Sequence, residues 1–162
     1  MLKLLKQHIE ETYQTFQSNA DDISILLPYL KSPEITTLPL DVIEFPLYIP
    51  DMLQELVDFM IDTSTDEQFK ALASSIYSYV FNPFDYIADT SETVIGFLDD
   101  ALIVFYGLQL IEDSQTDQFF KSIHQPKIIN AVCQCEDLLS ESILSLLKSF
   151  PLEVNKIIEI NE

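Results

Sequence analysis

The sequence has no tryptophan and very little glycine, cysteine or histidine: 2 Gly, 2 Cys and 2 His among 162 residues. Two glycines cannot supply a dinucleotide-binding G-x-G-x-x-G motif or a phosphate-binding P-loop, and neither motif occurs. The zinc-protease motif H-E-x-x-H is absent as well. A catalytic triad needs a nucleophile, a base and an orienting acid, and neither His8 nor His124 lies beside a nucleophile motif. The sequence therefore favours a protein that is not an enzyme.

Basic residues are also few: the chain has 8 Lys and Arg but 27 Asp and Glu, which gives a formal net charge of −19. Nucleic-acid binding depends on Lys and Arg that neutralise phosphates, so we expect no direct nucleic-acid binding. Anionic membrane surfaces are disfavoured for the same reason. Two interpretations of the acidity stay open: an ordinary solvated surface, or attraction to a basic partner or to metal ions.

The two cysteines, Cys133 and Cys135, lie in the helix-like stretch AVCQCEDLL. Residues two apart on a helix point about 200° apart, so these thiols can neither pair with each other nor chelate one metal ion together. Free thiols suit a reducing cytosol, which predicts a cytoplasmic protein. The first residues, MLKLLKQHIEETYQTF, lack the apolar core and cleavage site of a signal peptide and predict an amphipathic helix.

Apolar residues are abundant, at 48 % of the chain with 11 Phe. A chain of this length and composition can bury a sizeable core as one domain over residues 1–162. Apolar side chains recur at intervals of three and four residues in several segments, which predicts a mainly α fold. We expect a single-domain orthogonal or irregular bundle of about five to seven helices.

Prolines at positions 33, 39, 46 and 50 exclude a long helix between residues 31 and 50, since each interior proline removes a donor and clashes with the preceding turn. We expect an irregular segment there, extended or broken into short turns. A short strand is compatible with the pattern at 31–50. The C-terminal stretch LEVNKIIEI is ambiguous between a strand and a helical turn.

Other residues predict where helices start and stop. Ser64 and Glu67 form the S-x-x-E pattern of a capping box, which would open a helix at Thr65 or Asp66. Pro50 suits the first turn of the preceding helix, which covers MLQELVDFMID. A final long helix is expected to begin at Pro126, to run to about residue 150 and to be closed by the proline at 151.

Residues 94–111, VIGFLDDALIVFYGLQLI, are long enough to raise the question of a membrane span. Each of the two adjacent aspartates near the centre would cost roughly 2.5–3.5 kcal/mol on insertion, which offsets the gain from the apolar residues that follow. No Lys or Arg flanks the segment. We therefore predict a buried central helix and no transmembrane span.

Four aspartates stand within or beside this apolar region: Asp85, Asp89, Asp99 and Asp100. Asp85 and Asp89 are four residues apart, so a helical turn would place both carboxylates on one face. If residues 82–93 fold back on the next helix, the two pairs converge and must share a proton or a cation. Ligands made only of oxygen would favour Mg²⁺ or Ca²⁺, which predicts a metal site of these four residues.

Structural roles for the same aspartates stay open beside the metal site. Asp89 can cap the following helix, and Asp85 can brace the turn after Pro83. Asp99 or Asp100 can face solvent or pair with a lysine or a tyrosine. A partner-binding surface is the remaining alternative.

The stretch PFDYIAD followed by GFLDDALIV resembles the signature of the YkvA-like family, a bacterial domain of unknown function. That signature reads P-x-D-hydrophobic-I-P-D and, after a short spacer, G-hydrophobic-hydrophobic-D-D-hydrophobic. The positions that match it are Pro83, Asp85, Ile87, Asp89, Gly96, Asp99 and Asp100. Ala88 departs from it, because the family commonly has a proline there. A second common proline is missing from the spacer TSETVI, which is one residue longer.

The resemblance implies a helical hairpin core over residues 70–112 and, for some members, peripheral membrane association. It implies no established reaction. The charge and the resemblance together predict a non-enzymatic module that binds another protein. The more specific version of this prediction is that the partner is basic. An immunity-type or nucleic-acid-mimicking inhibitor of a basic partner and a site dependent on a divalent metal are the two alternatives.

Overall fold

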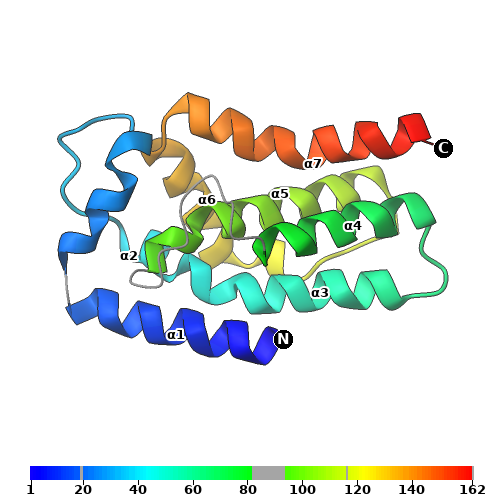
Figure 1. Cartoon of the computed structure of the whole chain (residues 1–162), viewed down its shortest axis with the longest axis horizontal. Helices are drawn as coiled ribbons and strands as arrows, with labels where there is room; N and C mark the ends of the chain where they lie inside the picture. The colour runs from blue at the N-terminus through cyan, green and yellow to red at the C-terminus, as the bar shows by residue number, and fades with distance from the viewer. Residues whose placement is uncertain (19, 82–93, 116, 162) are drawn as a thin grey trace.

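The apolar run that follows the paired aspartates becomes α5 (Leu98–Ser114), the central helix of the fold. The computed structural model describes residues 1–18, 20–81, 94–115 and 117–161, and over these ranges the chain is mainly α-helical (Figure 1). A 3₁₀ helix, η3 (Val94–Phe97), leads directly into α5. Every residue from position 94 to position 108 is buried. A helix enclosed on all sides needs no polar face, which explains the uninterrupted apolar run.

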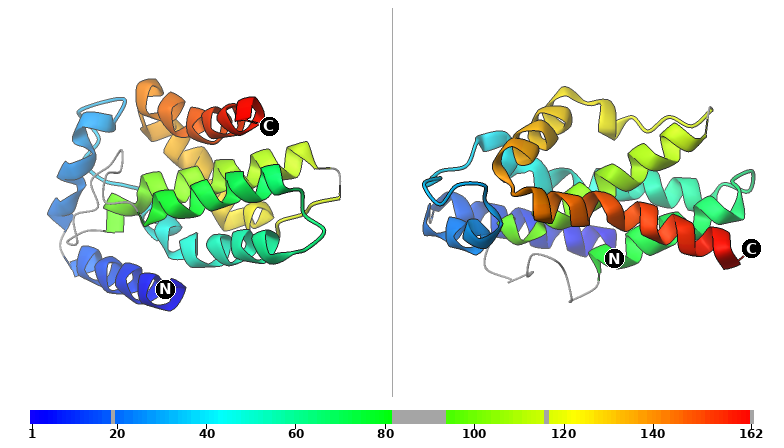
Figure 2. Two further views of the ribbon diagram at one scale, coloured as in Figure 1. Left: turned by 45° about the vertical axis from the view of Figure 1, so that its right-hand side comes forward. Right: turned by 90° about the horizontal axis from the view of Figure 1, so that it is seen from above.

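Helices on several sides cover α5 (Figures 1 and 2). It contacts α3, α4 and α7, while α1 packs against α3 and the short α2 packs against α6. The longer helices around α5 are α1 (Leu2–Ser18), α3 (Ile49–Ile61), α4 (Glu67–Val80), α6 (Pro126–Leu138) and α7 (Glu141–Asn161). The short elements are η1 (Ala20–Tyr29), α2 (Leu40–Glu44), η2 (Phe45–Tyr48) and η4 (Ser122–His124). The mainly α bundle expected from the sequence is confirmed.

The helical stretch Val94–Ser114 is long and apolar enough to cross a membrane by length and composition. Of its most apolar window, 89 % is buried inside the fold. The prediction of a buried central helix at 94–111 is confirmed by this packing.

Gly107 of α5 lies close against the side chain of Ile76 on α4. A Cβ atom built on Gly107 of α5 would collide with the Cδ1 atom of Ile76 on α4 and would lie 3.1 Å from its Cγ1. The two helices contact each other, as the hairpin predicted over 70–112 requires. The segment that joins them, 82–93, lies outside the described residues.

The proline-rich segment 31–50 folds without a strand, so the short strand that its sequence allowed does not form. Pro39 precedes the short α2, Pro46 lies in the first turn of η2 and Pro50 in the first turn of α3. Prolines are tolerated at these positions because the first backbone N–H groups of a helix have no intrahelical partner. The segment is therefore broken into short turns, as the sequence predicted.

Of the strand and the helical turn left open for the C-terminal stretch, the structure has the helical alternative, because α7 continues to Asn161 with Pro151 in its interior. Pro151 is buried, and α7 packs against both α4 and α5. This packing offsets the backbone hydrogen bond that a proline removes from a helix interior.

The single helix predicted from Pro126 to about residue 150 is two helices, α6 and α7. The break lies at Leu139, whose backbone is extended and forms an isolated antiparallel bridge with Leu30. The backbone N–H of Ser140 donates to the carbonyl of Tyr29 at 2.7 Å, and that of Lys31 donates to the carbonyl of Leu138 at 2.9 Å. Hydrogen bonds to a distant segment replace helical ones here, and no local pattern predicts that.

Candidate functional site

Asp99 and Asp100 occupy the first turn of α5, and neither has any exposed surface. The hydroxyl of Tyr79 on α4 donates a hydrogen bond of 2.8 Å to Oδ2 of Asp99. The first turn of a helix favours carboxylates, because it lies at the positive end of the helix dipole. The alternative in which these residues face solvent is wrong, and pairing with a tyrosine is confirmed for Asp99.

The other two predicted ligands, Asp85 and Asp89, lie outside the described residues, together with the caps expected near the start of the next helix. Among the residues that the structure does describe, no group of three or more His, Cys, Asp or Glu side chains is placed to hold a metal ion. The predicted site therefore has two of its four ligands in the described part, and its convergence stays a prediction.

Two glutamates hold the turn between α5 and α6. Glu55 of α3 accepts hydrogen bonds from the backbone N–H of Ser122, at 3.1 and 3.2 Å, and from the hydroxyl of the same residue. Glu112 of α5 accepts one from the backbone N–H of Phe120 at 2.9 Å and lies 2.6 Å from Nε2 of His124. These half-buried acids satisfy backbone donors at the start of η4, so their role is structural.

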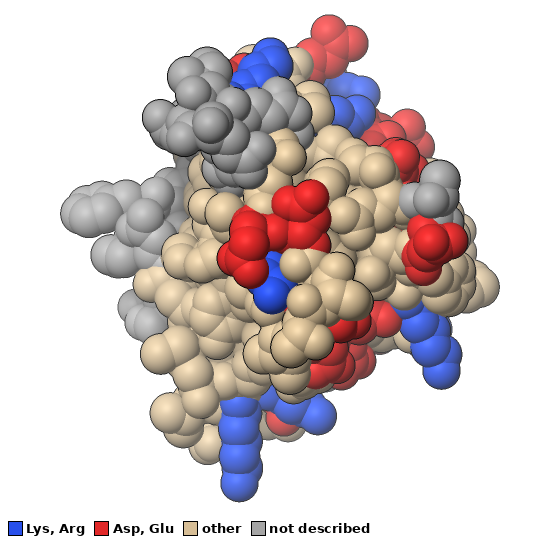
Figure 3. Space-filling model, turned by 90° about the vertical axis from the view of Figure 1, so that its right-hand side faces the viewer, with Lys and Arg blue, Asp and Glu red and all other residues tan. Residues whose placement is uncertain are grey.

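Exposed carboxylates gather at the end of the bundle where α3 and α5 finish and α4 begins. Figure 3 views this side of the molecule and shows several groups of red acidic atoms on it, with blue basic atoms among them and around the margin. A hollow of about 550 Å³ lies there between the α3–α4 turn and the segment after α5, lined by Ser, Thr and Gln side chains together with Asp62 and Asp117. The exposed acids of the helix ends and turns that meet here, called the acidic end below, are Asp58, Asp62, Asp66, Glu67, Asp113 and Asp117.

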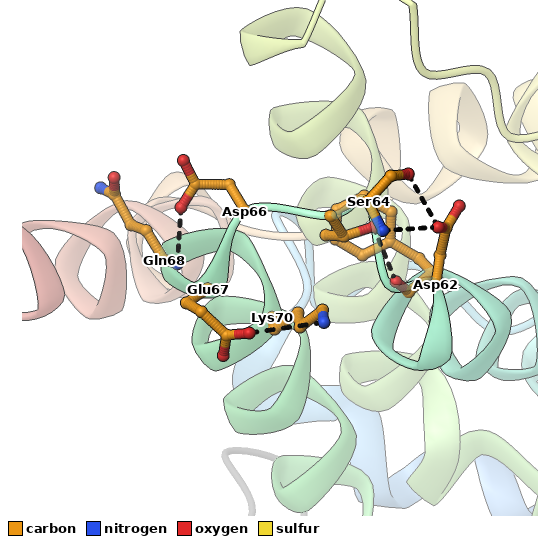
Figure 4. A network of polar contacts seen from close by, with 8 residues as sticks. Asp62, Ser64, Asp66, Glu67, Gln68 and Lys70 are labelled. Carbon is orange, nitrogen blue, oxygen red and sulfur yellow. Dashed lines mark hydrogen bonds and ion pairs between the residues drawn. The ribbon is translucent and has the colours of Figure 1, made fainter.

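The α3–α4 turn orders part of the acidic end (Figure 4). Oδ1 of Asp62 accepts hydrogen bonds from the backbone N–H of Ser64 at 2.9 Å and from its hydroxyl at 2.7 Å. These two bonds lower the pKa of the Asp62 carboxyl from its ordinary value of 3.8. The N-cap of α4 is Asp66, which accepts from the backbone N–H of Gln68 at 2.9 Å. The capping box predicted from Ser64 and Glu67 is therefore wrong, because Asp62 binds the Ser64 hydroxyl.

A groove runs along the C-terminal half of α5, with α6 on one side and α7 on the other. It consists of two adjoining hollows of about 320 and 380 Å³, and the side chains of Gln109, Asp113 and Glu136 line both. Ile129 on the α6 side is 41 % exposed, and Leu152 on the α7 side is 47 % exposed. We call this feature the α5 groove.

Glu136 of the α5 groove is held by contacts from α5 and α7. The Tyr106 hydroxyl donates to its Oε1 at 2.9 Å, and Nζ of Lys148 lies 3.6 Å from the same oxygen. Burial, and then the neighbouring Glu136 carboxylate, raise the pKa of Tyr106, so its hydroxyl is a protonated donor at neutral pH. Lys148 also lies 5.7 Å from the centre of the Tyr106 ring, a cation–π distance.

The two thiols differ in their surroundings. Cys133 is exposed and lines the α5 groove, whereas Cys135 is buried. Burial raises the pKa of Cys135 to about 12, so it stays a neutral thiol at physiological pH. Both thiols are free, as the sequence predicted.

The sequence did not single out the α5 groove, although part of its signal was readable. Gln109, Glu112 and Asp113 follow an apolar helical run at spacings of three and four residues, which marks one exposed face of a helix. Glu136 and Lys148 belong to two other helices, and only the tertiary packing brings them to that face.

No family model, no curated protein and no solved structure matches this chain. The likeness to the YkvA-like family therefore rests on the two aspartate-containing blocks described above.

Proposed function

We propose that this protein is a non-enzymatic interaction module that binds a basic protein partner. The observation that carries the proposal is the unbalanced charge: 27 acids against 8 bases. At the acidic end, Glu67 has an ion pair with Lys70 at 3.4 Å. The other five acids there make no ion pair with a described residue, so their charge is available to a partner.

Electrostatic complementarity would act mainly on the rate of association. A surface with excess negative charge steers a basic partner during diffusion, and the rate falls as salt screens the attraction. At 0.15 M ionic strength the screening length is about 8 Å, so the attraction acts chiefly at short range. An inhibitor that covers the basic active site of its target is the narrower form of this proposal.

The test is capture of a partner by the immobilised full chain from a lysate of its source cells at low salt. We expect a basic protein, bound in a stoichiometric amount and released by a salt step. A variant with Asp58→Asn, Asp113→Asn and Asp117→Asn should associate with that partner several-fold more slowly.

The matched control carries Glu10→Gln, Glu34→Gln and Asp137→Asn, which removes the same charge from exposed positions elsewhere. This control should keep most of the association rate. Failure to recover any stoichiometric partner at low salt would contradict the proposal.

A divalent-cation site is the second candidate. The observation that favours it is the complete burial of the neighbouring Asp99 and Asp100 side chains in the first turn of α5. Burial disfavours the charged form of a carboxyl group, whereas a nearby cation favours it. Mg²⁺ or Ca²⁺, held together with Asp85 and Asp89, would add such a cation to the contacts that these side chains already make.

A further inference from the structure

We infer that the α5 groove is the docking site for a basic amphipathic helix of the partner. This inference rests on the proposed function, because it names the surface of the module and the form of its ligand. It depends on three observations about the groove: its apolar walls, its acidic lining and its position along one helix.

The apolar walls carry the first part of the argument. Ile129 of α6 and Leu152 of α7 line the two parts of the groove and keep nearly half of their surface exposed. Half-buried Leu110 lines the hollow next to α7 with Leu152, and buried Phe105 and Val132 line the hollow next to α6 with Ile129. Each of the two adjoining hollows therefore has one exposed apolar side chain beside less exposed apolar lining, and a ligand that spans both hollows would cover the two.

The charges decide the sign of the ligand. Glu112, Asp113 and Glu136 line the groove, and Lys148 is the lysine that accompanies them. Glu136 is paired with Lys148, and Glu112 lies against His124, which also lines the groove. The charge left for a ligand is therefore that of Asp113, which is exposed and has no ion pair or hydrogen bond with any described residue. A ligand with basic side chains beside apolar ones would complement both properties of this lining.

The direction of the groove decides the form of the ligand. Its lining residues on α5 recur through Tyr106, Gln109, Leu110 and Asp113, so the groove follows the axis of that helix. Helices bind elongated grooves through apolar anchors spaced three and four residues apart, with polar residues on the outer face. A basic amphipathic helix therefore fits better than a single small cation, which would leave the apolar walls uncovered.

The probe for the test is a synthetic peptide of about 20 residues with Leu at helical spacing and Lys elsewhere. A peptide of the same composition in scrambled order is the control for helical amphipathicity. Binding is measured by fluorescence anisotropy at low salt with the full chain. Amide chemical shifts of the labelled protein then locate the site. We expect the largest shifts at residues 105–113, 129–136 and 148–152, and weaker binding of the scrambled peptide.

Two variants of the groove and two matched controls test whether the peptide binds in the groove. Asp113→Lys should weaken peptide binding about tenfold, because it replaces attraction by repulsion at the site. Leu152→Gln should weaken it about fivefold through loss of an apolar contact. Glu10→Lys makes the same charge change and Leu4→Gln the same apolar loss on exposed parts of α1, and both should change binding less than about twofold.

If Leu152→Gln lowers the melting temperature, Ile129→Gln on the other wall makes the same test. Equal losses in groove and control variants, or shifts spread over all acidic faces, would overturn the groove assignment and leave the interaction module standing. Self-association of the chain through the same residues would overturn it too, because a second copy would then be the occupant. Failure of the peptide to bind, while a basic partner is still captured, would also reject the groove. Failure of both experiments would reject the proposed function as well.

Discussion

At the scale of single residues, the acidic side chains divide by what surrounds them. Asp99 is fully buried and receives a hydroxyl donor from Tyr79. Glu55 and Glu112 are half-buried and bind backbone N–H groups of the turn before α6. Asp113 is exposed and has no ion pair with a described residue. The first three stabilise the fold, so only acids of the last kind can serve a partner without loss of structure.

Replacement of Tyr79 by phenylalanine should destabilise the protein by about 1–3 kcal/mol, because a buried carboxyl group loses a hydrogen-bond donor. Urea denaturation followed by circular dichroism measures this change. Tyr77→Phe is the matched control on the same helix, since the Tyr77 hydroxyl has no hydrogen bond with a described residue and the side chain is half-buried. If both variants have the same free energy of unfolding, the Tyr79–Asp99 bond contributes nothing to stability.

The start of α4 offers a second test at this scale. Asp66→Ala should lower the free energy of unfolding by about 1 kcal/mol, because the backbone N–H of Gln68 loses its cap. Ser64→Ala removes an exposed bond to Asp62 and should change stability by less than about 0.5 kcal/mol. Thermal and urea melts of the two variants compare them directly. A larger loss of stability in Ser64→Ala than in Asp66→Ala would support the Ser64 cap that the sequence predicted.

At the scale of helices, the recurrence of apolar residues every three or four positions predicted which segments are helical. Tertiary contacts decided where several of these helices end. Pro50 and Pro126 begin helices as predicted, because their missing N–H groups are not needed there. Leu139 interrupts the predicted final helix because residues 29–31 supply its neighbours' hydrogen bonds. Pro151 does not end α7, because the helix packs on α4 and α5 and Pro151 itself is buried.

The contact between α4 and α5 yields a prediction about packing. Gly107→Ala normally gains about 0.5–1 kcal/mol in a helix, but the added methyl group would collide with Ile76. Overpacking costs about 1–3 kcal/mol, so we expect a net loss of stability. Ile76→Val removes the colliding Cδ1 atom, and Gly107→Ala should then cost less than in the parent chain. A double-mutant cycle of unfolding free energies measures the coupling, and additive effects would show that the contact does not limit the crossing.

At the scale of the whole molecule, the sequence predicted the composition of a functional surface better than its location. The excess of acids is visible in any count of the residues. The α5 groove combines side chains of three helices, and its walls, Ile129 and Leu152, resemble ordinary core positions in the sequence. The apolar run predicted a buried helix but left open whether Asp99 or Asp100 faces solvent, and the structure buries both. The choice of Tyr79 as a partner required the packing of α4 on α5.

The net charge of −19 also predicts how the stability of the whole molecule responds to salt. Like charges repel in the folded state, and salt screens that repulsion. We therefore expect the melting temperature to rise as NaCl increases from about 10 mM to about 300 mM. MgCl₂ and CaCl₂ at the same ionic strength separate general screening from a specific site, because an ion bound only to the folded state adds its own stabilisation. An equal rise with all three salts would contradict the cation site. A larger rise with Mg²⁺ or Ca²⁺ that disappears in Asp99→Asn would support it, whereas one that persists in that variant would place the ions on the exposed acids instead.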